Sequence, residues 1–487
     1  MKLFKIILFA IFCLLAMPCF AQNKGKKNSN TQPYPYGNPI IHHMYTADAA
    51  PHVMPDGRVW MVTSVDSENG GGYSTMHEYH TFSSADMVTW TDHGTVFNIK
   101  DVAPDSVGTA LWALWAPDMI YRNGKYYLYY PVRILYPDSL NANGGKVVKT
   151  YIGVAVSDAP DKQFKVLNPK MQGTSGIDPA VFADDDGEVY LYWGSHNAAK
   201  LKENMSEFAT KPLKLDVDTD RFMEAIWMNK RAGKYYVSYH TKYDNNVKGK
   251  RDDPDRPKSE LAYSVGDNPL GPFKYVGTFN YELGVNVKNG PRNAGQDFVP
   301  WRLTQSNHGG IVEFHGQEYL FYHTSALSSW RQDTFKAEGT WTQRSVCVDK
   351  LDYNPDGTII PVQQTIEGVP SVKINQPFDI LLDKQTLTIS DKQQVLEYKN
   401  IALGTGYYYF GLTAHNVKKT IRAEIHLDKP DGLLIGTVRI DKDGIGETFL
   451  RNAKGNHTVF IVFKGETGAY DLTVSDLHFF AGSPKSK

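Results

Sequence analysis

The sequence predicts an all-β protein, a five-bladed β-propeller followed by a β-sandwich. Three observations lead to this prediction: a hairpin pattern that occurs five times, strand-like segments between these hairpins, and a change of composition after residues 354–357. In each hairpin a short apolar run precedes a turn glycine, and an aromatic, β-branched strand follows it. The turn glycines are Gly57, Gly124, Gly187, Gly233 and Gly316.

The hairpins lie at long, irregular intervals, which is typical of a propeller. Each hairpin in such a fold buries its apolar faces only against neighbours arranged around an axis. Strand-like segments at residues 82–90, 152–158 and 261–265 each follow one hairpin and precede the next. Five blades of about four strands each would account for residues 38–365.

Two segments precede the predicted propeller. Residues 1–21 have the features of a secretory signal: two lysines, an apolar stretch and a small-residue cleavage site. Cys19 would suit a lipoprotein, but Pro18 is a poor fit to the small residue that precedes a lipid-attachment site. We therefore expect cleavage after Ala21 and an exported protein, periplasmic or secreted. Residues 22–37 are rich in Lys, Asn, Pro and Gly and are predicted to be a disordered tether.

Charge and cysteine content narrow the expected partners. The 487-residue chain has a formal net charge of −1, which becomes −3 when the signal and its two lysines are removed. No nucleic-acid or other polyanionic partner is therefore expected. Cys347 is the one cysteine outside the signal, so no disulfide is expected to stabilise the exported domain. The chain after the signal has no apolar stretch long enough to span a membrane.

The last part of the chain differs in composition from the predicted propeller. All nine tryptophans lie between Trp60 and Trp341. Short alternating strands follow at residues 385–389, 420–425, 433–438 and 457–463. Residues 372–487 are therefore predicted to form a β-sandwich of roughly one hundred residues.

One position of the hairpin pattern carries a polar or aromatic side chain in all five copies. Counting back nine residues from the first four turn glycines gives Asp48, Trp115, Asp178 and Glu224, and counting back eight from Gly316 gives His308. The first strand of each blade lines the central channel of a propeller, so these side chains should meet at one mouth. A single Asp-Pro such as Asp178–Pro179 is more often a simple turn. The shared position is what indicates a site.

Three carboxylates at one channel mouth repel one another unless they hold a ligand or share protons. Carboxylate oxygens suit calcium, so a metal site is one interpretation. Acid/base catalysis on a sugar is the other. Glycoside hydrolysis needs one carboxylate to activate water and one carboxylic acid to protonate the leaving oxygen.

At these residues the chain resembles glycoside hydrolase family 43, a family of five-bladed propellers. The matching stretches lie between about residues 38 and 365 and are Tyr45–Asp48, Trp115–Asp118, Gly176–Pro179, Phe222–Ala225, Asn307–Gly310 and Arg344–Asp349. The resemblance implies that Asp48 is the general base, Glu224 the general acid, and Asp178 the residue that tunes and orients the acid. It also implies a reaction that inverts the configuration of the sugar.

The resemblance extends to substrate and metal contacts. It implies that Trp115 forms a wall of the sugar subsite and that Arg344 reaches the sugar hydroxyls. In some family members the histidine equivalent to His308 ligates a calcium ion or its water, so His308 is the candidate for a structural calcium, and no cofactor is required. The first motif departs from many family members, because two alanines separate Asp48 from Pro51.

The predicted sandwich resembles family 6 carbohydrate-binding modules. The similarity lies chiefly at residues 431–438 and 455–465. Such modules commonly use a Trp as their sugar platform, and since this region has none, Tyr407, Tyr408 and Tyr409 are the candidates. A structural lid against the propeller is the alternative to a binding module.

Together these features predict an exported, inverting glycosidase that acts on plant cell-wall oligo- or polysaccharides. The expected substrates are terminal β-xylosyl or α-L-arabinofuranosyl groups. Arabinan or galactan hydrolysis is the alternative within the family, and a glycan-binding propeller without catalysis is the alternative from another class. The three acids favour catalysis, because a lectin has no need of three carboxylates in one pocket.

Overall fold

The computed structural model describes residues 34–68, 75–102, 109–110, 114–217, 222–241, 260–280, 306–335, 343–390, 394–465 and 472–481. The predicted signal at residues 1–21 and most of the predicted tether lie outside these ranges. The tether prediction is wrong for its last residues, because Tyr34 is buried and packs with Leu327 and Trp330. Residues 34–487 form one compact unit.

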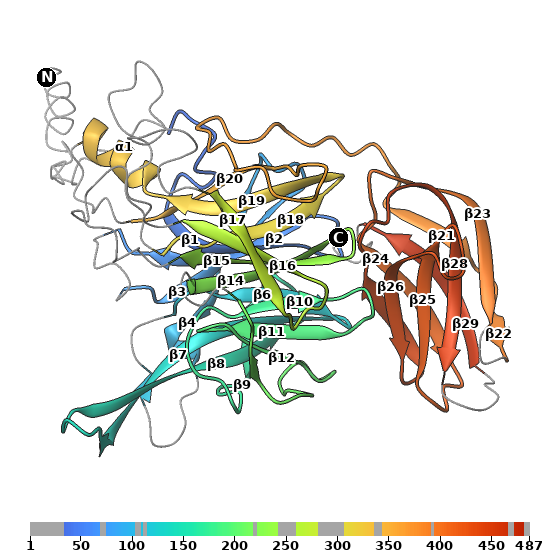
Figure 1. Cartoon of the computed structure of the whole chain (residues 1–487), viewed down its shortest axis with the longest axis horizontal. Coiled ribbons are helices and arrows are strands. Elements are labelled where there is room, and N and C mark those ends of the chain that lie inside the picture. The colour runs from blue at the N-terminus through green and yellow to red at the C-terminus, as the bar shows by residue number, and fades with distance from the viewer. Residues whose placement is uncertain are drawn as a thin grey trace, which may run out of the picture. The chain divides into compact units, whose positions relative to one another are not determined.

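Five antiparallel sheets follow one another along the chain (Figure 1). The first contains β1 (Tyr45–Val53), β2 (Val59–Asp66), β3 (Glu78–Ser84) and β4 (Thr91–Asn98). The second contains β5 (Thr109–Ala110), β6 (Asp118–Arg122), β7 (Lys125–Leu140), β8 (Lys146–Ser157) and β9 (Lys165–Asn168). The third contains β10 (Ala180–Ala183), β11 (Val189–Trp193), β12 (Asn197–Lys200) and β13 (Leu213–Lys214). The fourth contains β14 (Phe222–Arg231), β15 (Lys234–Thr241), β16 (Leu261–Gly266) and β17 (Phe273–Asn280), and the fifth β18 (Gly310–Phe314), β19 (Gln317–Thr324) and β20 (Ser345–Leu351).

The hairpin turns of the blades have the backbone that their glycines predict. Asn123, Ala232 and His315 have φ of 48° to 49°, and the glycine after each has φ of 76° to 90°. Two successive residues at positive φ characterise the type I′ turn, whose twist matches that of the flanking strands. The local sequence therefore determines where each hairpin reverses.

Apolar side chains from all five blades form the main core. It takes in Trp60, Leu128, Tyr192, Val237 and Leu320, one from the strand after each hairpin turn, and each is at most 5% exposed. These strands are the aromatic, β-branched segments of the repeated pattern. Each blade therefore packs against its neighbours through the residues that identify it in the sequence.

The segment before β1 joins the first blade to the last. The Ile40 N–H donates to the Val346 carbonyl over 2.8 Å, and the Asn38 side chain exchanges hydrogen bonds of 3.0 and 2.9 Å with the backbone of Val348. This segment thus lies along β20, where it covers a strand edge. Helix α1 (Ala326–Phe335), which the sequence did not predict, follows β19.

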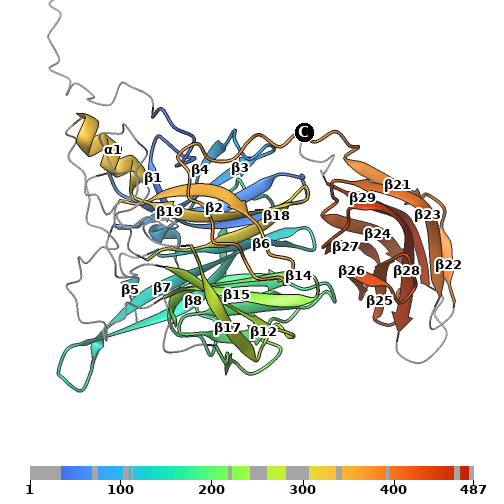
Figure 2. The same cartoon turned by 45° about the horizontal axis from the view of Figure 1, so that its top comes forward.

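Two further sheets form a β-sandwich. One contains β21 (Asp379–Asp383), β22 (Leu387–Ile389), β24 (Tyr409–His415), β27 (Gly444–Phe449) and β29 (Leu472–Phe480). The other contains β23 (Val395–Gly404), β25 (Ile421–Leu427), β26 (Leu433–Ile440) and β28 (Gly455–Gly465) (Figure 2). Phe410, Ile425, Ile461 and Phe479 lie fully buried in the core of the sandwich. The predicted fold class, a five-bladed propeller followed by a β-sandwich, is confirmed.

The sandwich and the propeller share an apolar core. Tyr408, Tyr409 and Phe480 of the sandwich belong to one buried cluster with Val53 and Phe314 of the propeller. The Tyr409 hydroxyl donates to the Val53 carbonyl over 2.9 Å. The sandwich is therefore joined to the propeller by buried aromatic side chains rather than by the connecting segment alone.

The tyrosine platform predicted on the sandwich is wrong. Tyr407, Tyr408 and Tyr409 are only 1% to 3% exposed. The Tyr407 hydroxyl donates to the Pro377 carbonyl over 2.6 Å, and the Tyr408 hydroxyl accepts from the His315 N–H. The alternation of a strand does not reveal that both of its faces are covered, one by the sandwich core and the other by the propeller.

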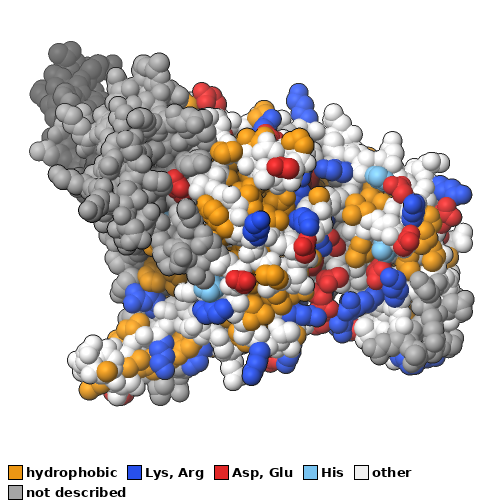
Figure 3. Space-filling model, viewed as in Figure 1, with side chains coloured by type: hydrophobic (Ala, Val, Ile, Leu, Met, Phe, Trp, Pro, Cys, Tyr) orange, Lys and Arg blue, Asp and Glu red, His pale blue; other side chains and the backbone are white. Residues whose placement is uncertain are grey.

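The surface of the described residues carries charges of both signs. On the face drawn in Figure 3, lysine and arginine side chains are interspersed with aspartate and glutamate, and no broad region of one sign is visible among the described residues. Within those residues no helix is long and apolar enough to cross a membrane.

Candidate active site

The five side chains that share one position of the repeated pattern meet at one cavity. Asp48 lies in β1 and Glu224 in β14, while Trp115, Asp178 and His308 lie two or three residues before β6, β10 and β18. All five line a cavity of about 240 Å³. The prediction that first strands bring these residues to one channel mouth is therefore correct in its geometry.

The channel closes on one side of this cavity. The adjoining cavity measures only about 20 Å³ and shares Asp48, Asp178 and His308 with the first. Most of its other lining residues are alanine, proline and glycine, whose backbones come close together. Trp227 lines it as well. Among the described residues the site is thus a blind pocket, closed on the side of the channel.

The backbone is strained where it enters this pocket. Asp48, Asp178, Ala225 and Ser306 have φ of 53° to 58°, which is uncommon for residues other than glycine. β-bulges interrupt β1 at Asp48 and β14 next to Glu224. Strain of this kind costs about 1–3 kcal/mol per residue and gathers at functional sites, and bulges redirect the side chains beside them.

Asp48 is surrounded by hydrogen-bond donors. The Ser64 hydroxyl donates to Oδ2, Arg344 Nη1–H donates to Oδ1 over 2.8 Å, and His308 Nδ1 lies 3.0 Å from the same oxygen. Burial raises the pKa of Asp48, but the positive charges of Arg344 and His308 outweigh it and hold the pKa well below its usual range. Asp48 is therefore ionised in the free protein.

A second carboxylate, Asp66, holds Arg344 in place. Arg344 Nε–H and Nη2–H donate to the two oxygens of Asp66 over 3.0 and 2.9 Å, and the Arg344 backbone N–H donates to Oδ2 over 2.9 Å. Both side chains are buried. This bidentate geometry fixes the guanidinium, which then orients Asp48. Arg344 lines the pocket, as predicted, and its contact with a sugar stays a prediction.

His308 lies between two of the acids. Nδ1 is 3.0 Å from Asp48 Oδ1, and Nε2 is 3.6 Å from Asp178 Oδ1. Burial lowers the pKa of His308, but the two carboxylates raise it well above its ordinary value. Burial raises the pKa of Asp178, His308 counteracts this, and the charges of Glu224 and Asp48 add to the rise.

Glu224 has a histidine partner on the neighbouring strand. His240 is its cross-strand partner in the β14–β15 ladder, with Nδ1 3.3 Å from Glu224 Oε1. Burial raises the pKa of Glu224, but the hydrogen bond and charge of His240, together with the charge of His308 and a hydrogen bond from Ser306, outweigh burial and lower the pKa to about 2. In the free protein the pKa of Glu224 is thus lowered, while that of the neighbouring Asp178 is raised.

Comparison with known proteins identifies the family. The family model of glycosyl hydrolases family 43 matches residues 36–359, which is more than half of the chain. The chain belongs to glycosyl hydrolase family 43.

This family 43 enzyme is similar to characterised relatives. The xylosidase/arabinosidase of Bacteroides ovatus is 32% identical over 376 residues, which are 66% of this chain and 95% of the relative. The arabinoxylan arabinofuranohydrolase of Bacillus subtilis (strain 168) is 28% identical over 504 residues, 89% of this chain and 90% of the relative. The crystal structure of a family 43 arabinoxylan arabinofuranohydrolase from Bacillus subtilis, in complex with cellotetraose, is 24% identical with a TM-score of 0.52. It covers 92% of this chain and 98% of its own, and it shows the similarity of fold across both domains.

Four residues that contact the pocket-lining side chains of the family 43 enzyme were not predicted: Ser64, Asp66, His240 and His323. Met76 and Ser306, which line the pocket itself, were not predicted either. His323 accepts from the backbone N–H of Asp48 through Nδ1 over 3.4 Å. The sequence held a signal for three of the first four. Counting forward seven residues from the turn glycines of the first, fourth and fifth hairpins gives Ser64, His240 and His323. Asp66 had no such signal, since its role depends on Arg344, which lies 278 residues further along the chain.

Asp48, His308 and His323 form the one candidate ion-binding group among the described residues, with ligand atoms within 4.8 Å of one another. Calcium takes about six to eight oxygen ligands. This group offers one carboxylate and two imidazoles, and the Arg344 guanidinium already lies 2.8 Å from that carboxylate. Waters would have to supply most of the oxygen ligands of an ion here. The structural calcium at His308 stays a prediction, and no catalytic step is assigned to a metal.

Proposed function

We propose that this family 43 enzyme is an exported, inverting glycosidase that removes terminal β-xylosyl or α-L-arabinofuranosyl groups from plant cell-wall oligo- and polysaccharides. The main support is the blind pocket in which three carboxylates lie beside the indole of Trp115. Its volume of about 240 Å³ is below the roughly 300–1,000 Å³ typical of pockets for drug-sized ligands, which suits a single sugar unit. A closed end suits the last unit of a chain.

The relatives support pentosides as the substrate class. The similar proteins of Bacteroides ovatus and Bacillus subtilis are a xylosidase/arabinosidase and an arabinoxylan arabinofuranohydrolase. Release of terminal sugars from arabinan or galactan is the alternative within the family. A glycan-binding propeller without catalysis would not need an ionised, doubly hydrogen-bonded carboxylate at the bottom of its pocket.

Asp48 is the proposed general base. It is ionised, and Arg344 and Ser64 fix its orientation. In this mechanism Asp48 takes a proton from a water molecule, which attacks the anomeric carbon from one side of the sugar. Glu224 protonates the departing oxygen on the other side, so the configuration inverts.

Glu224 must hold a proton when the glycosidic bond breaks. In the free protein its pKa is about 2, because His240, His308 and Ser306 together outweigh the effect of burial. A sugar that enters the pocket displaces water from Glu224, and this further burial raises the pKa of the carboxyl. Asp178, whose Oδ2 accepts from the Ala225 N–H over 3.2 Å, is the proposed tuning residue, because its negative charge favours the protonated form of Glu224.

The proposal is tested with purified protein that lacks residues 1–21. It is incubated with nitrophenyl β-xyloside, nitrophenyl α-L-arabinofuranoside, and oligosaccharides from arabinoxylan, arabinan and galactan. We expect release of xylose or arabinose, and none from the Asp48→Asn variant. Proton NMR early in the reaction should show the anomer opposite to that of the substrate; the same anomer would refute Asp48 as a base for water. No release from any of these substrates would refute the enzymatic proposal.

Export is tested separately. Expression of the full chain in a bacterial host, followed by mass spectrometry of the protein in the periplasm or medium, should give a mature chain that begins at Gln22. Retention of residues 1–21 on the folded protein would contradict the proposed signal.

A further inference from the structure

One hairpin of the propeller is longer than the rest. β7 has 16 residues and β8 has 12, whereas the strands after the hairpin turns of the other blades have 5 to 8. In Figures 1 and 2 the β7–β8 hairpin projects from the other blades. A strand pair of this length is more than the packing of a blade requires, so its extension calls for a separate role.

The base of this hairpin is tied to the wall of the pocket. Arg133 of β7 lies opposite Thr150 of β8, whose carbonyl accepts from the Gly176 N–H over 3.3 Å. Gly176 lies two residues before Asp178 in the chain. A backbone hydrogen bond thus joins the hairpin to the segment that carries Asp178.

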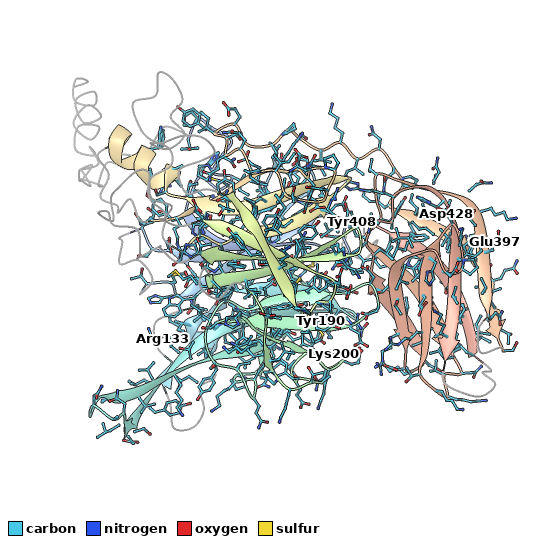
Figure 4. All side chains as sticks on the ribbon, viewed as in Figure 1. Arg133, Tyr190, Lys200, Glu397, Tyr408 and Asp428 are labelled. Atoms are coloured by element: carbon cyan, nitrogen blue, oxygen red, sulfur yellow. The ribbon has the colours of Figure 1, made fainter. Side chains whose placement is uncertain are left out.

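Arg133 lies against the indole that lines the pocket. Its guanidinium carbon is 5.2 Å from the centroid of the Trp115 ring, within the distance of a cation–π contact. The neighbours of Arg133 on β7, Val132 and Ile134, are at most 1% exposed, which fixes the backbone on both sides. Arg133 itself is half-buried, and Figure 4 shows it near the base of the projecting hairpin.

We infer that Arg133 binds the sugar unit next to the one being released, and that it sets a preference for glycan chains over simple glycosides. The inference rests on the proposed function, because it concerns the substrate of the same pocket. Trp115 lines the pocket, so a bound chain that extends along this wall comes within reach of a side chain that lies against the same indole. Arg133 lies against that wall.

The chemistry of the side chain suits this role. A guanidinium has five N–H donors in a rigid plane, and sugar hydroxyls accept hydrogen bonds. Stacking on an aromatic ring fixes that plane before the substrate arrives, so less conformational entropy is lost on binding. A lysine ammonium cannot stack in this way, so Arg133→Lys should not restore the function of the arginine.

The test compares two substrates of the same sugar with different leaving groups. One is the oligosaccharide that the wild type cleaves best among xylobiose and arabinose-substituted xylotriose. The other is the corresponding glycosyl fluoride, whose leaving group is a single atom. For Arg133→Ala we expect kcat/KM on the oligosaccharide to fall roughly ten-fold to a hundred-fold, the range for loss of a charged hydrogen bond, with little change on the fluoride. Inhibition by the free monosaccharide, which reports the pocket alone, should stay unchanged.

Lys149→Ala is the matched control, because Lys149 is a cation of the same hairpin that points to the opposite face and lies over the Tyr136 ring instead. It should leave both substrates unaffected. Equal losses on the oligosaccharide and the fluoride in Arg133→Ala, or no loss on either, would overturn the inference. So would wild-type selectivity in Arg133→Lys. Failure of the wild type to cleave any pentoside would instead refute the proposed function.

Discussion

The hydrogen bond between His240 and Glu224 favours the ionised form of the proposed acid. Removing this hydrogen bond should change the pH dependence of the enzyme. The pKa of Glu224 falls from an ordinary 4.5 to about 2 although burial acts in the opposite direction, and His240 makes the largest contribution to this fall, ahead of His308 and Ser306. A change of this size corresponds to about 3 kcal/mol in favour of the ionised form. His240→Phe removes the nitrogen and keeps a ring of similar shape in a site that is only 1% exposed.

The direction in which the pH profile shifts depends on the proton that Glu224 donates. Glu224 must be protonated to act, so activity falls as pH rises through its pKa. In His240→Phe the largest influences that lower the pKa of Glu224 are gone, and burial, which raises it, is opposed only by the charge of His308 and the hydrogen bond of Ser306. The alkaline limb of kcat/KM should therefore move to higher pH. In the wild type the alkaline limb of kcat should lie above that of kcat/KM, because bound sugar buries Glu224 further.

The measurement is a set of initial rates on one oligosaccharide across the pH range in which the fold remains intact by circular dichroism. His240→Asn is the matched variant, since its amide can still donate to Glu224, and its profile should resemble that of the wild type. If His240→Phe leaves the alkaline limb where it was, then either Glu224 is not the acid or His240 does not control its proton. Either result would refute the reasoning.

Four further perturbations test the catalytic assignments and two other parts of the structure. Glu224→Gln should lose most activity on oligosaccharides and much less on a glycosyl fluoride, whose leaving group needs no proton. Asp48→Asn should lose activity on both substrates. If the loss in Asp48→Asn depends on the leaving group, the two roles are reversed. Asp66→Ala leaves the buried Arg344 with one carboxylate fewer, so the free energy of unfolding in urea should fall by about 3–5 kcal/mol. A fall below about 1 kcal/mol would show that Asp48 alone holds the guanidinium. Ending the chain after Val369 exposes the apolar core that the propeller shares with the sandwich. The shortened protein should therefore aggregate or lose activity even on nitrophenyl glycosides. A soluble, active propeller would instead indicate that the sandwich is an independent module.

The fold could be predicted from the sequence because its repeats are local. Each hairpin is specified by about twenty consecutive residues: an apolar run, a turn glycine and an aromatic strand. The positive φ of each turn and the alternation of each strand depend on neighbours in the chain, so the five blades and the sandwich strands could be predicted from the sequence. Equivalent positions in equivalent units meet around an axis, which is why Asp48, Asp178 and Glu224 could be placed at one mouth.

What only the tertiary structure decided depends on contacts between residues far apart in the chain. Arg344 reaches Asp48 across 296 positions, and Tyr409 reaches Val53 across 356. The first contact sets which acid is ionised, and the second buries the tyrosines that the sequence offered as a sugar platform. A pKa depends on charges within a few ångströms and on the amount of water excluded, and both are fixed only when separate blades come together. The residue types of the site were therefore readable from the sequence, whereas their protonation and the role of the sandwich were decided by packing.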